Sequence, residues 1–86
     1  PISQYETIEE LLIDGNEQGL THIVIDQSQK QDNLRKEFLI KIYKNENKYN
    51  FLKKIYDSNN EGFNYKLKIF EIDYKLFNQH IEIKNK

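Results

Sequence analysis

The sequence predicts one small α/β domain of the α+β kind, with the element order α-β-α-β-β. Apolar residues recur at helical spacing in two stretches, at 5–12 and at 34–43. Runs rich in β-branched and aromatic residues at 20–25 and 65–74 indicate strands. The length of 86 residues gives room for a single modest core. We therefore expect a mixed three-stranded sheet with two helices on one face and a C-terminal hairpin.

The first helix is expected to start at a capping box and to stop at Gly19. Ser3 and Glu6 have the spacing at which a serine hydroxyl and a glutamate side chain satisfy the first amides of a helix. Gly19 is a natural stop because glycine adopts the left-handed conformation without a steric cost. The apolar stripe of this helix consists of Tyr5, Ile8, Leu11 and Leu12.

The first strand and the second helix follow in order. Residues 20–25 are nearly all apolar, which predicts a strand buried on both faces and ended by Asp26. The polar residues 27–33 predict a surface loop, after which Asp32 or Asn33 caps the second helix. The stripe of that helix is Leu34, Phe38 and Ile42, and the polar run 44–48 should end it.

The C-terminal half is expected to form a hairpin and a tail. Residues 51–57 have a helical spacing of apolar residues, but they are rich in aromatics and directly precede turn residues. Between helix and strand we favour a short helical turn and then a strand over 53–57, followed by a turn over 58–62 and a long strand over 65–74. The apolar phase of the long strand switches at Phe70, which a bulge or a change of packing partner would explain. Residues 1–78 would then be the domain, and 79–86 a polar C-terminal tail that frays.

Composition excludes several classes of protein. The net charge of −1 argues against a nucleic-acid binder, which usually carries a basic excess on one face. The absence of cysteine leaves no disulfide or thiolate metal site. No apolar run approaches the roughly 20 residues that a membrane span needs. The chain begins at Pro1 and contains no methionine, so we expect it to be a domain of a longer protein.

Few residues are candidates for chemistry. His22 and His80 are the only histidines, and a hydrogen-bonded strand histidine explains His22 better than a metal or catalytic role. Asp26 ends a strand and suits a plain turn. Glu71 and Asp73 are two apart and flanked by lysines, so they are expected to be cross-strand ion partners rather than an acid–base pair.

No catalytic, cofactor-binding or metal-binding residue is therefore predicted, and no cofactor. The glycines form no phosphate-binding pattern, and no nucleophile or zinc-protease motif occurs. The sequence holds six tyrosines and five phenylalanines, most of which fall on inward stripes. Those nearest the loops are candidates for surface interaction: Tyr49, Phe63 and Phe77.

Two segments resemble a known family. One runs from Glu17 through Gly19 to Asp26; the other runs from Ile55 through Gly62 and Phe63 to the Lys66–Tyr74 strand. Together they resemble the soluble C-terminal region of archaeal membrane-bound glycosyltransferases of the dolichyl-phosphate-mannose–protein mannosyltransferase type. In that family a helix leads through a glycine into a core strand, and a late strand closes the domain.

The resemblance implies a context and carries no site residue. The catalytic acids and the lipid-phosphate sugar donor of such enzymes belong to the transmembrane part, so this segment would be an accessory domain that is not itself catalytic. Its partners would be the transmembrane part of the parent and a protein or glycan acceptor, on the extracytoplasmic side. The alternative is a free-standing protein-interaction module that binds through the hairpin or an exposed sheet edge.

Overall fold

The computed structural model describes residues 4–27, 37–62 and 64–85. It confirms a small α+β domain and contains, in these ranges, three helices and one three-stranded antiparallel sheet of order β1-β3-β2. The elements are α1 (Ile8–Gln18), β1 (His22–Asp26), α2 (Glu37–Lys44), the 3-10 turn η3 (Glu46–Lys48), β2 (Leu52–Asp57), the 3-10 turn η4 (Ser58–Glu61), β3 (Leu67–Ile72) and α3 (Tyr74–Lys84).

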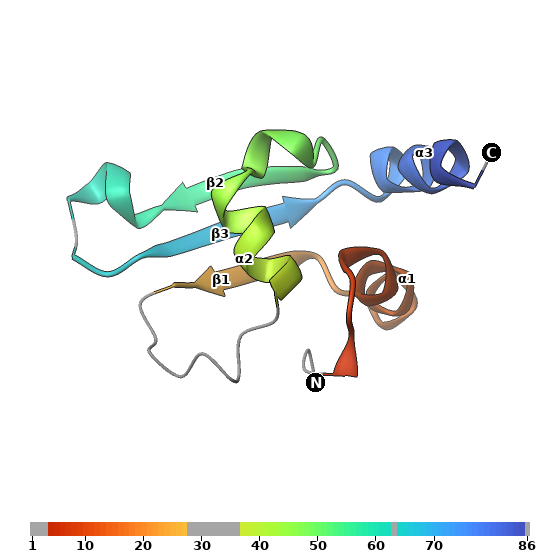
Figure 1. Cartoon of the computed structure of the whole chain (residues 1–86), viewed down its shortest axis with the longest axis horizontal. Coiled ribbons are helices and arrows are strands. Elements are labelled where there is room, and N and C mark those ends of the chain that lie inside the picture. Colours follow the sequence, from red (N-terminus) through yellow and green to blue (C-terminus); the bar gives the residue numbers. More distant parts are fainter. Residues whose placement is uncertain (1–3, 28–36, 63, 86) are drawn as a thin grey trace.

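The helices divide between one face of the sheet and one of its ends. Helix α2 crosses one face, while α1 and α3 lie at the end where β1 and β2 begin (Figure 1). α1 and α3 are joined through Glu9, whose Oε2 lies 2.9 Å from Nε2 of His80 and 3.0 Å from Nζ of Lys84. β3 lies at the centre of the sheet, so β1 and β2 are its two edges.

The sheet differs from the expected mixed one because β3 runs antiparallel to both of its neighbours. The chain also adds a third helix where a polar tail was expected. The carboxylate of Asp73 accepts a hydrogen bond from the amide of Leu76 at 3.0 Å, and this cap starts α3 immediately after β3. Residues 79–84 are therefore the second half of a helix, and the expected boundary at residue 78 falls inside it.

The first helix starts later than expected and stops where expected. Thr7 accepts a hydrogen bond from the amide of Glu10 at 3.1 Å, so Thr7 and not Ser3 is the cap. Ser3 itself lies outside the described residues, as do Asp32 and Asn33. The helix ends at Gly19, whose φ of 82° is left-handed.

Sequence reasoning interpreted the burial patterns of two strands wrongly. In β1, Ile23 and Ile25 are 3% exposed but Val24 is 55% exposed, because helices cover only one face of the sheet. In β3 the buried residues are Lys68, Phe70 and Ile72, which alternate regularly on one face of the strand, so this strand needs no bulge. The irregularity lies in the partner strand β2, between Lys54 and Tyr56.

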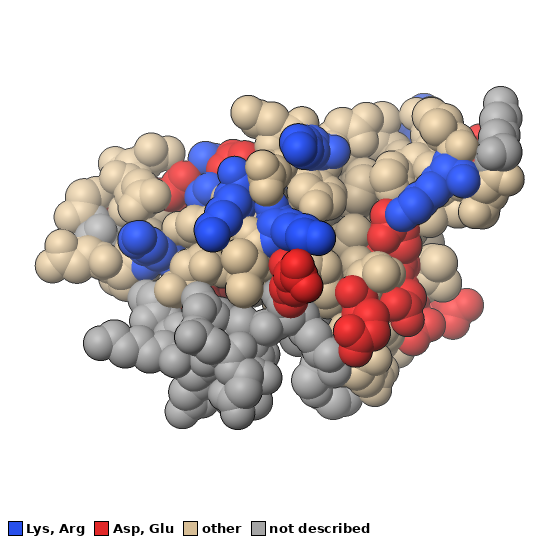
Figure 2. All heavy atoms as spheres, viewed as in Figure 1, with Lys and Arg blue, Asp and Glu red and all other residues tan. Residues whose placement is uncertain are grey.

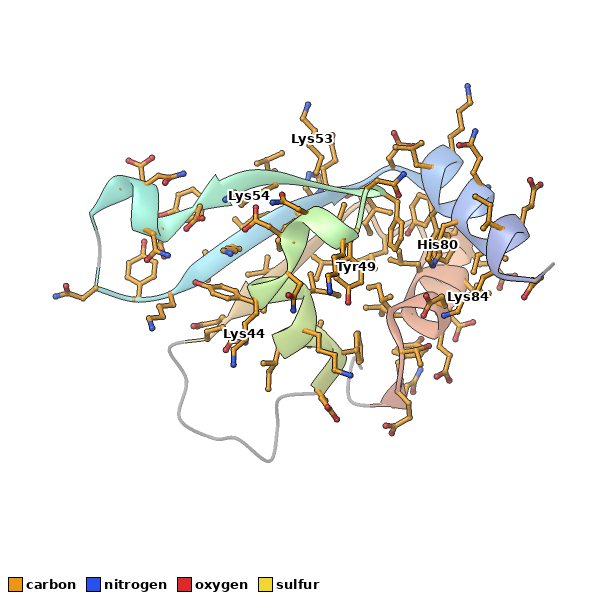
Figure 3. All side chains as sticks on the ribbon, turned by 45° about the horizontal axis from the view of Figure 1, so that its top comes forward. Lys44, Tyr49, Lys53, Lys54, His80 and Lys84 are labelled. Atoms are coloured by element: carbon orange, nitrogen blue, oxygen red, sulfur yellow. The ribbon has the colours of Figure 1, made fainter. Side chains whose placement is uncertain are left out.

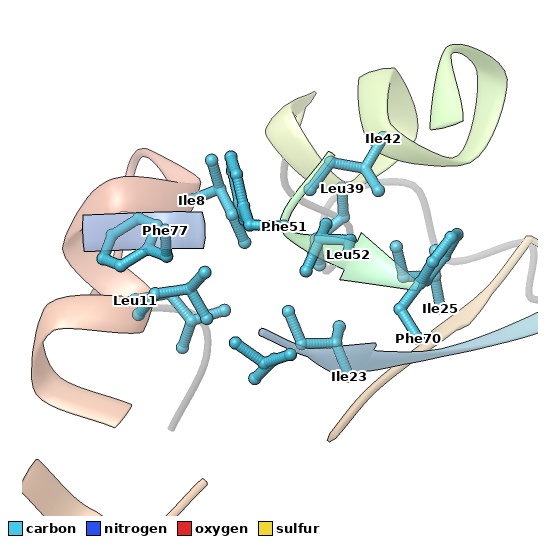
Figure 4. Close-up of a cluster of buried hydrophobic side chains, with 12 residues drawn as sticks. Ile8, Leu11, Ile23, Ile25, Leu39, Ile42, Phe51, Leu52, Phe70 and Phe77 are labelled. Carbon is cyan, nitrogen blue, oxygen red and sulfur yellow. The ribbon is translucent and has the colours of Figure 1, made fainter. Parts of the chain in front are cut away.

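The core lies between the covered face of the sheet and the three helices (Figure 4). Phe51 and Phe77 meet edge to face near its α1–α3 end, with ring centroids 5.2 Å apart. All the buried apolar residues belong to one cluster: Ile8, Leu11, Leu12, Ile23, Ile25, Leu39, Ile42, Phe51, Leu52, Phe70, Ile72 and Phe77.

Candidate functional site

Of the three aromatic residues singled out from the sequence, the structure describes Tyr49 and Phe77. Phe77 is 2% exposed and packs in the core, so its proposed surface role is wrong: α3 turns it inward. Tyr49 is half-buried and meets Phe51 edge to face at 6.1 Å. Phe63 lies outside the described residues.

Four charged residues near the turn that follows α2 form ion pairs with one another: Glu46, Lys54, Asp57 and Lys68. Nζ of Lys54 lies 3.0 Å from a carboxylate oxygen of Glu46 and 2.8 Å from one of Asp57. Figure 3 shows Lys54 beside the turn that follows α2, while Lys53 points away from the sheet. The hydrogen bond from Lys68 holds the pKa of Glu46 below its usual value, although desolvation raises it. This arrangement joins β2 and β3 to the turn that follows α2 through ion pairs.

A groove separates the C-terminal half of α1 from the start of β1. It has a volume of about 550 Å³, within the range typical of binding sites. Its accessible apolar surface comes mainly from Leu20 and Val24, since Leu11 and Ile23 are only 5% and 3% exposed. The full lining is Tyr5, Leu11, Gly15, Gln18, Gly19, Leu20, His22, Ile23 and Val24.

Hydrogen bonds hold the walls of this groove in place. The hydroxyl of Tyr5 donates to Oδ2 of Asp14 at 3.1 Å. The hydroxyl of Tyr74 donates to the carbonyl oxygen of Leu20 at 2.7 Å, and burial raises its pKa. Gly15 lets the wall close, since a β-carbon there would lie 2.8 Å from Cδ2 of Leu20. The groove is therefore a built feature of the α1–β1 junction.

One rim of the groove is the outer edge of β1. The amide of Ile72 donates to the carbonyl oxygen of Thr21 at 2.9 Å, and the amide of Gln27 donates to the carbonyl oxygen of Lys66 at 2.8 Å. Thr21 and Gln27 flank β1, so the odd-numbered residues between them also turn their backbone groups toward β3. His22 and Val24 turn theirs the opposite way, since backbone direction alternates along an antiparallel strand. In the described part of the chain no strand pairs with that side of these two residues.

The two edges of the sheet are protected unequally. Edge strands are commonly shielded from further pairing by lysines and by bulges. β2 has both, with Lys53 and Lys54 in sequence and an irregularity at Ile55. β1 has a regular register over all five of its residues and no lysine, proline or bulge. Sequence reasoning missed this difference because it depends on which strand lies in the middle.

The remaining candidates from the sequence have ordinary structural roles. Nδ1 of His22 lies 2.8 Å from the hydroxyl oxygen of Thr21, and its Nε2 lies 3.8 Å from a carboxylate oxygen of Glu71. The prediction of a hydrogen-bonded strand histidine is confirmed. Glu71 faces His22 across the strands, and this contact is an ion pair only when the histidine is protonated. Asp73 instead caps α3.

Neither metal ligation nor a membrane span is found within the described ranges. They hold no group of three or more His, Cys, Asp or Glu residues arranged to bind a metal ion. None of their helices combines the length and apolarity needed to cross a bilayer. The chain matches no protein-family model, no curated protein and no solved structure. The arguments for function therefore come from the groove and from the edge of β1.

Proposed function

We propose that this domain is a non-catalytic binding module that takes an extended segment of a partner polypeptide as an additional strand along β1. The observation that carries the proposal is the outer edge of β1 beside the groove, with which no strand pairs in the described part of the chain. Strand addition at an exposed sheet edge is a common mode of peptide recognition, in which main-chain hydrogen bonds give affinity and pockets give specificity.

The backbone groups that the added strand needs are present. His22 and Val24 each offer one amide and one carbonyl group in the plane of the sheet, on the side away from β3. The side chain of Val24 is 55% exposed on the open face, so it does not cover this edge. The half-buried Leu20, which packs against the core, would contact a side chain of the added strand that enters the groove.

A proline substitution tests the outer edge of β1 without disturbing the rest of the fold. Val24→Pro removes an amide that points away from β3, and proline is tolerated at such positions of edge strands. Val24→Thr is the matched control because it keeps the amide and the β-branch. We expect both variants to unfold at temperatures close to that of the unchanged chain.

The binding test uses a displayed library of random linear peptides selected on the immobilised chain. Selected peptides are synthesised, and their contacts are mapped by amide chemical-shift changes. We expect the changes to centre on His22 and Val24, and Val24→Pro but not Val24→Thr to abolish binding. Selection of no peptide, or shifts centred elsewhere, would refute the proposal.

We also propose, as the wider context, that the module is an accessory domain of a membrane-bound glycosyltransferase that uses a lipid-phosphate sugar donor, on the extracytoplasmic side. The support is the resemblance of two segments, 17–26 and 55–74, which contain the neighbouring strands β1 and β3. The partner segment would then come from the acceptor or from the transmembrane part. The gene is expected to encode several apolar spans of about 20 residues upstream of Pro1. A gene without such spans would exclude this context and leave the binding module untouched.

A further inference from the structure

Charge is distributed very unevenly along this chain. Residues 1–29 contain six acidic residues and neither lysine nor arginine, whereas residues 30–86 contain eight acidic residues and all 13 lysines and arginines. The described part of the acidic stretch is the segment that forms α1 and β1, the two elements that line the groove. Acidic side chains accordingly gather over α1, and lysines over α2 and the strands beside it (Figure 2).

One of these carboxylates lies next to the groove. Asp14 accepts a hydrogen bond from the hydroxyl of Tyr5, a lining residue. A segment docked along β1 therefore meets negative charge at the rim and apolar surface within the groove. Complementary charge across a rim selects partners and speeds their encounter.

We infer that the segment bound along β1 is basic, with lysine or arginine alternating with aliphatic residues. This inference rests on the proposed strand addition at β1. In an extended segment alternate side chains point to opposite sides, so one set can enter the groove while the other stays in solvent near Asp14. Because the main chain supplies the hydrogen bonds, this pattern and not an exact sequence sets the preference.

A second copy of the chain is a poorer occupant of the same edge. Pairing β1 with β1 of another molecule would bring two copies of the acidic α1–β1 half together. Like charges placed opposite each other disfavour association. The basic edge strand of a second copy, β2, carries the irregularity at Ile55 that opposes regular pairing. A separate basic segment avoids both difficulties.

The test compares two fluorescent peptides that differ only in charge, acetyl-Lys-Ile-Lys-Val-Lys-Ile-Lys-amide and its counterpart with Glu in place of Lys. Binding is measured by anisotropy on the whole chain. We expect the lysine peptide to bind about tenfold or more tightly than the glutamate peptide, and this difference to shrink between about 0.05 M and about 0.5 M salt.

Variants locate the charge effect. Asp14→Asn should weaken binding of the lysine peptide about three- to tenfold. Asparagine keeps an oxygen for the Tyr5 hydroxyl, so the wall of the groove is preserved. The control is Glu82→Gln, which removes a charge from an exposed position on α3 outside the groove lining and should change affinity less than about twofold.

Each outcome decides between the two proposals. A lysine-peptide preference that is lost in Val24→Pro, with amide shifts at His22 and Val24, supports the inference. Equal binding of both peptides, or binding of neither while library peptides still dock on β1, overturns the basic preference and leaves strand addition standing. Binding that survives Val24→Pro shows attraction to acidic surface elsewhere and overturns the inference. A β1-paired dimer of the chain alone, detected by sedimentation, overturns both.

Discussion

The side-chain nitrogen of Lys68 lies 2.6 Å from Oε1 of Glu46, so the central strand of the sheet is fastened to the turn that follows α2. The same nitrogen donates to the carbonyl oxygen of Tyr43 at 2.8 Å and lies 4.1 Å from the centre of the Tyr43 ring. Lys68 is 8% exposed, and burying a charge is tolerated only when it is paired and hydrogen-bonded. The pairing of Lys68 therefore matters more for stability than that of a surface lysine.

Replacing this lysine should destabilise the domain. Lys68→Met keeps much of the side-chain length but leaves the Tyr43 carbonyl without its donor and Glu46 with Lys54 alone. We expect a loss of about 1–3 kcal/mol in the free energy of unfolding, measured with urea. Lys53→Met, exposed on β2, is the matched control and should change stability by less than about 0.5 kcal/mol. Equal effects of the two substitutions would show that the buried pair contributes nothing.

Acidification should destabilise the domain through two glutamates. Burial raises the pKa of Glu9, but hydrogen bonds from His80 and Lys84 outweigh it and leave the pKa lowered. The hydrogen bond from Lys68 likewise lowers the pKa of Glu46. A carboxyl group whose pKa is lower in the folded state stabilises it fully above the ordinary value of 4.5 and loses that contribution as the pH falls through the folded pKa.

The expected measurement is a fall in melting temperature that begins near pH 4.5 and continues below it. Glu46→Gln should lower stability at neutral pH and make the acid decline shallower, since one of the linked groups is gone. Glu82→Gln, exposed on α3, should leave the slope unchanged. A Glu46→Gln variant with the full acid decline would contradict this linkage.

A substitution at Gly15 should destabilise α1 although helix propensity favours it. Gly to Ala in a helix interior usually stabilises by about 1 kcal/mol. At this position the new β-carbon would lie 2.8 Å from Cδ2 and 3.1 Å from Cβ of Leu20, which is held by the bond from Tyr74 to its carbonyl. We expect Gly15→Ala to lower the free energy of unfolding by about 1 kcal/mol. Asn16→Ala, on the exposed side of the same helix, should be neutral or slightly stabilising, and a gain at Gly15 would show that Leu20 moves freely.

Features set by local chemistry were predictable from the sequence. Gly19 ends α1 because only glycine takes its φ of 82° without strain, and the turn after β2 ends in the same way at Gly62, with a φ of 74°. Hairpin signals around that turn placed β2 and β3 next to each other, as the structure shows. These features depend on a few consecutive residues.

Features set by distant contacts were not predictable. Lys68 counts as polar in any alternation pattern, so the sequence did not show that it lies on the buried face of β3. It is buried because its side-chain nitrogen donates to the carbonyl oxygen of Tyr43 and to Glu46, which are distant in sequence. The start of α3 was hidden because Phe70, Ile72 and Tyr74 alternate as in a strand, while the cap at Asp73 acts only once β3 has ended. The edge of β1 beside the groove could not be predicted either, because β1 is an edge strand only when β3 pairs with both other strands.

Helix α3 should be required for folding, although its last residues resemble a tail. A chain that stops at residue 78 loses the ring of His80, whose centroid lies 4.9 Å from that of Phe51, and the contact of Lys84 with Glu9. It also leaves Phe77 on a helix of barely more than one turn, far shorter than helices that persist without packing. Exposing this side of the core removes buried apolar area that a domain of this size cannot spare.

We therefore expect the chain 1–78 to lose its cooperative thermal transition, measured by circular dichroism. A chain lacking only residues 85 and 86 keeps all of α3 and should unfold within a few degrees of the whole chain. The His80→Ala variant of the whole chain should fall between them, because it loses the contacts with Phe51 and Glu9 but keeps the helix. If the 1–78 chain unfolds cooperatively at the temperature of the whole chain, then α3 only covers a core that is already complete without it.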